Sequence, residues 1–225
     1  MDPALQVLAW WIAFGGTHTF LSHPPIRERL IRHLGEQGFR VLYSLVAFAT
    51  FIPLMTTFFV HRVSRGVWLP ALALVPGVWW ATMVVNLIAI VLLVLGFASP
   101  NPVSTLTARP GAGVRGILHV TRHPAFMGFA LLGLGHLLVL RAPIDMAFFG
   151  GLLVYSVVGA WHQDYRRRRS GPELAEFYRQ TSFFPFVAVW QGRTRLALSE
   201  IPIGALSVAG GVFVLVFLLH HRIFG

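Results

Sequence analysis

The chain contains no cysteine and no lysine, and it has few charged residues of either sign. Without cysteine, disulfides, thiolate metal sites and cysteine nucleophiles are excluded. Only 12% of the 225 residues are charged, where a soluble domain of this size carries roughly a quarter. Hydrophobic residues make up 56% of the chain. This composition predicts an integral membrane protein in a single domain, residues 1–225.

Long apolar runs predict an all-α polytopic bundle with about six membrane-spanning helices, because one helical span needs about 20 apolar residues. The expected spans are 4–21, 41–60, 77–98, 118–140, 143–162 and 202–220. Between the spans, residues 67–76 are expected to approach the membrane interface, residues 99–117 to form an irregular loop, and residues 172–180 to form a short amphipathic helix. No secretory signal is expected, because residues 1–10 contain no basic residue and lead directly into an apolar segment.

The net charge of +10 does not predict a nucleic-acid partner, because the arginines lie in short loops between apolar spans. Such arginines commonly set topology and contact anionic lipids. Most of them lie in the first, third and fifth loops. The positive-inside rule therefore predicts a multi-pass protein of the inner (cytoplasmic) membrane, with these three loops in the cytoplasm and both termini outside.

Four histidines lie in or at the ends of the predicted spans: His18, His123, His136 and His162. An ionisable residue at membrane depth is costly and is a candidate functional residue. Neutral imidazole binds haem iron and other transition metals. For His18 and His136, a structural role through packing or a hydrogen bond to a carbonyl is an equally good interpretation. His123 follows Arg122 in an Arg-His-Pro turn, which suits a helix cap or the binding of an anionic group by the two residues.

Several ordered motifs resemble the NnrU family, whose relatives include the plant and cyanobacterial zeta-carotene isomerases. The matching segments extend over about 12–195 and comprise T-H-T-F-L-S at 17–22, L-G-E-Q-G-F-R-V-L-Y-S at 34–44, T-R-H-P at 121–124, G-L-G-H at 133–136, G-A-W-H-Q-D at 159–164 and T-S-F-F-P-F at 181–186. The resemblance implies a b-type haem between His18 and His136. It also implies either a redox-dependent cis–trans isomerase of a polyene or a haem protein of nitric oxide and denitrification metabolism. The substrate would be apolar, or small and redox-linked, and a non-catalytic haem sensor or assembly subunit is a further alternative.

Two positions depart from the isomerases. Gly133 stands where they have a cysteine implicated in redox-dependent ligand exchange, and Tyr155 stands where they have a histidine. The depth of the residues favours another pair of ligands. His136 lies about 18 Å from the predicted cytoplasmic face at ~1.5 Å per residue, so that His123 is closer in depth to His18. The motifs favour His18 with His136 as the metal ligands, and Arg122 and His123 at the mouth of the cofactor site.

A more distant resemblance is to the isoprenylcysteine carboxyl methyltransferases, which bind S-adenosylmethionine. Its residues are Arg122, His123, Pro124, Asp164, Tyr178 and Pro185. It implies a second function, that of a membrane methyltransferase with S-adenosylmethionine held at the cytoplasmic face by Arg122, His123 and Asp164.

Overall fold

The computed structural model describes residues 1–62, 75–109, 111–140, 142–169 and 172–224. The predicted interfacial segment 67–76 therefore lies largely outside the described residues, and so do two of the arginines between the predicted spans, Arg65 and Arg141. Within the described ranges the chain is helical and has no strand, which confirms the predicted all-α class.

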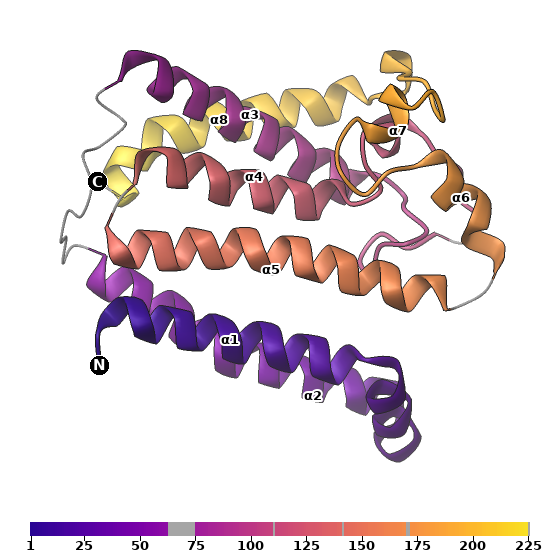
Figure 1. Ribbon diagram of the computed structural model, residues 1–225, viewed down its shortest axis with the longest axis horizontal. Helices are drawn as coiled ribbons and strands as arrows, with labels where there is room; N and C mark the ends of the chain where they lie inside the picture. The colour runs from indigo at the N-terminus through magenta and orange to yellow at the C-terminus, as the bar shows by residue number, and fades with distance from the viewer. Residues whose placement is uncertain (63–74, 110, 141, 170–171, 225) are drawn as a thin grey trace.

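Six longer helices form the bundle, and short helices and 3₁₀ turns lie at one of its ends (Figure 1). The long helices are α1 (Pro3–Ser22), α2 (Pro24–His61), α3 (Pro76–Ala98), α4 (Pro124–Val139), α5 (Pro143–Arg168) and α8 (Ile203–Phe224). The short ones are η2 (Gly116–His119), η3 (Pro172–Leu174), α6 (Ala175–Gln180), α7 (Val187–Trp190) and η4 (Leu198–Glu200). Residues 172–180 thus contain the predicted short helix, and most of 99–117 is irregular as expected.

Proline fixes the start of five long helices. Residues Pro3, Pro24, Pro76, Pro124 and Pro143 each occupy the first turn, where a missing N–H costs no hydrogen bond and the fixed φ suits the helix. Helix α2 is interrupted near its start, where Gly35 has φ 70° and ψ 169°. This backbone conformation is open to glycine and strained for most other residues.

The predicted helical membrane bundle is confirmed, although the number of spans is not exactly the expected six. Among the described residues, four helices are long and apolar enough to cross a membrane: α2, α3, α5 and the stretch Ile203–His220 of α8. The expected first span, 4–21, is the 20-residue α1, which is not among these four. The expected fourth span corresponds to α4, an apolar helix of 16 residues. All six helices nevertheless run alongside one another (Figure 1).

The predicted start of the fourth span at residue 118 is wrong. Residue 118 belongs to the 3₁₀ turn η2, and α4 begins only at Pro124. A residue before proline is pushed out of the helical region, and His123 accordingly has φ −121° and ψ 53°. The turn before α4 is held by residues 182–186. Arg122 N donates a hydrogen bond to Ser182 O (3.0 Å), and Phe186 N donates one to Val120 O (2.8 Å).

Helix α5 lies between α4 and the α1–α2 pair (Figure 1). Glycines bring the backbones of α3, α4 and α5 close together: a Cβ on Gly128 would lie 2.8 Å from Ala89 O, and one on Gly133 would lie 2.7 Å from Phe149 O. Small residues at helix interfaces permit this close packing in membranes. On the other side of α5, Trp11 and Phe14 of α1 pack with Leu54 of α2 and with the start of α5.

The outer faces of the bundle are apolar and match a bilayer. Large apolar side chains are exposed along α2, α3 and α8, and little of the apolar stretches of α2 and α8 is buried. Both termini lie at one end of the bundle, and the α1–α2 corner, the end of α5 and α6 lie at the other (Figure 1). The first, third and fifth loops, which carry most arginines, therefore share one end.

Candidate functional site

Arg122, His123 and Asp164 form a buried ionic cluster at the arginine-rich end. Arg122 and His123 lie in the turn before α4, and Asp164 lies near the end of α5. The Asp164 carboxylate accepts hydrogen bonds from Arg122 Nε (2.8 Å) and from His123 Nε2 (2.6 Å), and it lies 2.6 Å from Arg122 Nη2. His123 is 2% exposed and Asp164 is 5% exposed. A buried carboxylate needs such partners, because an unpaired charge away from water is very costly.

Segments far apart in the sequence hold this turn in place. Asn101 Nδ2 donates to Arg122 O (2.9 Å), and Thr121 Oγ1 donates to Phe183 O (2.6 Å). Beside Asp164, Gln163 Nε2 donates to Val103 O. The loop after α3, the turn before α4 and the residues after α6 are therefore joined around one cluster.

Tyr178, just after the start of α6, covers the cluster. Its ring lies 5.1 Å from the Arg122 guanidinium and 4.2 Å from that of Arg168, distances that suit cation–π contact. Its hydroxyl is buried beside the Asp164 carboxylate. Burial, with the negative charge of Asp164 nearby, raises the pKa of this phenol, so that it stays neutral.

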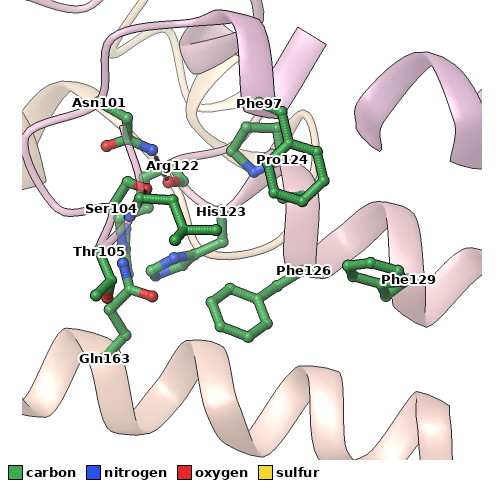
Figure 2. Close-up of a pocket in the computed structure, with 13 residues that line it drawn as sticks. Phe97, Asn101, Ser104, Thr105, Arg122, His123, Pro124, Phe126, Phe129 and Gln163 are labelled. Carbon is green, nitrogen blue, oxygen red and sulfur yellow. Dashed lines mark hydrogen bonds between the residues drawn. The ribbon is translucent and has the colours of Figure 1, made fainter. Parts of the chain in front are cut away.

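A cavity of about 220 Å³ adjoins the cluster (Figure 2). Its polar side comprises Asn101, Ser104, Thr105, Arg122, His123 and Gln163. Its apolar side comprises Gly96, Phe97, Leu106, Pro124, Ala125, Phe126 and Phe129. Phe97 on α3 and Phe129 on α4 are 47% and 37% exposed, so the apolar side reaches the outer face of the bundle. An apolar cavity with a few fixed polar groups is the usual form of a small-molecule site.

The structure places the predicted haem ligand His18 on the other side of α5. Its ring packs against Phe14 at 4.4 Å, Tyr43 at 4.5 Å and Tyr155 at 6.2 Å between ring centroids. His18 therefore lies between α1, α2 and α5, away from the residues that line the cavity.

His136 lies in the last turn of α4, stacked on Phe149 at 4.2 Å and 6.2 Å from the ring of His220 in α8. Its Nδ1 is hydrogen-bonded to Leu132 O (2.8 Å). His136 therefore lies between α4, α5 and α8, towards the end of the bundle opposite to Arg122.

As arranged, His18 and His136 do not fit one haem. Their α5 neighbours, Tyr155 and Phe149, are six residues apart, which is about 9 Å along the helix and about 120° around it. Two axial imidazole nitrogens must each reach the same iron at about 2 Å. Moreover, Gly15 and Gly133, each three residues before one of these histidines, pack closely on Tyr155 and on the α5 backbone. Haem binding stays a prediction, which oxidised and reduced absorption spectra of the purified protein test.

Arg122 and His123 are neighbours in the chain, and the Asp164 carboxylate is hydrogen-bonded to both side chains. The Arg122 guanidinium also donates to Thr181 O, so a cofactor carboxylate would compete with established partners. The methyltransferase alternative stays a prediction that calorimetry with S-adenosylhomocysteine tests. Sequence reasoning missed Asn101 and Gln163 as site residues. The polar pair Gln163-Asp164 that ends an apolar run was the available signal.

These features define a multi-pass helical membrane protein with an ionic site and a half-apolar cavity at one end. The chain matches the NnrU protein family over residues 6–225. It belongs to the NnrU family, and the match extends beyond the residues 12–195 on which the resemblance first rested.

Two curated relatives are the chloroplastic 15-cis-zeta-carotene isomerases of Arabidopsis thaliana and Zea mays. The first is 30% identical over 196 residues, which cover 85% of this chain and 52% of the relative. The second is 26% identical over 196 residues, which cover 82% of this chain and 50% of the relative. The chain thus spans about half the length of these relatives. No solved structure matches it.

Proposed function

We propose that this protein is a membrane isomerase that acts on an apolar polyene taken from the bilayer. The observation that carries the proposal is the cavity beside the ionic cluster, whose apolar side includes the partly exposed rings of Phe97 and Phe129. Support from the comparisons is the similarity to two proteins named for isomerising a carotene. The cavity and this similarity both favour a long hydrocarbon substrate that enters the protein sideways from the lipid.

The size of the cavity limits what enters it. About 220 Å³ is below the roughly 300–1,000 Å³ of pockets that enclose a whole drug-sized ligand. Only a segment of a long polyene is therefore held, while the remainder extends past Phe97 and Phe129 into the lipid. This arrangement suits isomerisation of one double bond, since the rest of the chain need not move through the protein.

The residues around the cavity have different roles in this proposal. The rings of Phe126 and Phe129 exclude water from the held segment and restrict its orientation. His123 and Arg122 are the ionisable groups that line the cavity, and Asp164 fixes the orientation of both side chains. The preorganised charge of the Arg122 guanidinium can stabilise charge that develops along the polyene as a double bond twists. The nitric oxide and sensor alternatives lack a comparable observation and stay predictions.

Filling the cavity with a larger side chain is expected to slow conversion of the polyene strongly. Thr105 lines the cavity from an irregular loop and is exposed, so Thr105→Trp adds a large ring without disturbing a helix. The purified protein, in vesicles containing a cis-carotene, should convert it to the trans isomer, measured by chromatography in the dark. Thr105→Trp should reduce the rate by at least about tenfold, because misplacing the reacting segment removes its productive geometry.

Ala108→Trp provides the matched control, because Ala108 lies on the same loop, is exposed and does not line the cavity. It should convert the carotene at the wild-type rate. A folded wild-type protein that leaves the cis isomer unchanged would contradict the proposal.

The orientation is the second part of the proposal: the arginine-rich end faces the cytoplasm. The chain contains no cysteine, so a single introduced cysteine reports its side of the membrane without background. A membrane-impermeant maleimide applied to intact cells should label Asp2→Cys and leave Gln191→Cys unlabelled until the cells are opened. The opposite labelling pattern would reverse the orientation.

A further inference from the structure

A second group of side chains lies at the corner between α1, α2 and α5, away from the cavity. His23 forms the junction of α1 and α2, and His162 lies near the end of α5. Their rings are 6.0 Å apart between centroids, and the Tyr165 ring lies 5.6 Å from His23 and 6.2 Å from His162. The three rings are close to parallel. They bring α5 to the α1–α2 turn at the arginine-rich end (Figure 1).

His162 carries a polar atom that nothing in the described chain satisfies. The side chain is 7% exposed, and its Nε2 is buried without a hydrogen-bond partner among the described residues. Buried polar atoms are nearly always hydrogen-bonded, and each exception needs a physical reason. A ligand that accepts a hydrogen bond from this imidazole would provide one.

The charges around His162 are mainly positive. Arg166 lies one turn further along α5 and is close enough to act electrostatically on His162. Arg27, in the first turns of α2, and Arg167 both repel Arg166. An acidic group also lies at this corner, the exposed Glu36, 3.8 Å from Arg27. The site therefore has an excess of donors and positive charge.

We infer that this corner, formed by His23, Arg27, His162 and Arg166, binds a phosphate group. Guanidinium groups suit phosphate oxygens because they offer several donors in a fixed plane, and an imidazole N–H adds one more. The corner lies where α1 and α5 end, which is the depth of lipid headgroups in a spanning bundle. The phosphate comes either from an anionic lipid or from a soluble anion.

This inference does not depend on the proposed isomerase activity, since none of its residues lines the cavity. Its test uses the full-length protein, purified in a neutral detergent and stripped of lipid. The midpoint of thermal unfolding is measured with increasing phosphatidylglycerol in the micelles. A parallel titration uses inorganic phosphate against chloride at equal ionic strength. A ligand that binds the folded state and not the unfolded state raises the midpoint progressively as its concentration exceeds its dissociation constant.

Phosphatidylglycerol should raise the midpoint of the wild type. His162→Phe and Arg166→Gln should each raise the lipid concentration needed for the same shift by about tenfold, which is the loss of affinity expected for one charge-assisted hydrogen bond. His162→Phe retains a ring for the contacts with His23 and Tyr165, and Arg27→Gln offers a second route should either variant be unstable. Arg29→Gln removes the same charge from an exposed position of α2 and should respond as the wild type does.

If only the lipid raises the unfolding midpoint, the ligand is a lipid headgroup. If both probes raise it, free phosphate is sufficient for binding. Either supports the site. No rise with either probe would overturn the inference. An equal loss in Arg29→Gln and Arg166→Gln would also overturn it, because the effect would then be general charge.

Discussion

Asp164→Ala is expected to lower the stability of the folded protein by about 3–5 kcal/mol, the usual cost of removing one partner of a buried ion pair. The substitution leaves both Arg122 and His123 buried without the carboxylate that holds them. The loss should be visible as a large fall in the thermal unfolding midpoint in detergent. Asp164→Asn keeps the size of the side chain and one acceptor, so its effect should be smaller.

Glu176→Ala is the control for this prediction. Glu176 also pairs with an arginine, Arg179, at 2.6 Å, but both side chains are exposed, and exposed pairs contribute little to stability. Its midpoint should stay close to that of the wild type. Equal effects of Asp164→Ala and Glu176→Ala would show that the buried cluster does not stabilise the fold.

Gly128→Ala is expected to destabilise the bundle although alanine is the better helix former. The added methyl group would lie 2.7 Å from Leu93 Cγ and 2.8 Å from Ala89 O, so α3 and α4 must separate. Overpacking of this kind costs about 1–3 kcal/mol, which outweighs the gain of about 0.5–1 kcal/mol from replacing glycine in a helix. Unfolding midpoints measure the difference.

Gly210→Ala makes the same substitution in α8, where nothing lies within 4 Å of the new Cβ. It should leave stability unchanged or raise it by up to about 1 kcal/mol. The two variants should therefore change stability in opposite directions. A stabilising Gly128→Ala would contradict the close approach of α3 and α4.

The helices could be predicted from the sequence largely because their signals are local. Apolar length and a proline in the first turn are sufficient to locate α3 and α5. Pro124 marks the start of α4 in the same way, but the apolar residues before it, from residue 118, concealed this boundary. The sequence could not show that the turn at 120–122 is held by hydrogen bonds to residues 182 and 186, which are remote in the sequence.

The site could be predicted only in part. Arg122 and His123 were singled out from the Arg-His-Pro turn, and Asp164 entered through a family resemblance. The cavity depends on Asn101 and on Phe97, which the chain brings to the turn by folding back from α3. The depth estimate had already separated His136 from His18. In the structure α5 lies between them, and sequence spacing alone does not reveal such an obstacle.

The central claim is that the cavity beside His123 holds a segment of a polyene. Visible-region circular dichroism of the protein titrated with a cis-carotene tests this most directly, because an achiral polyene becomes optically active when a chiral site fixes its conformation. The account predicts a saturable induced signal for the wild type and for Ala108→Trp, and its loss in Thr105→Trp. An undiminished signal in Thr105→Trp, or no signal in the wild type, would contradict it.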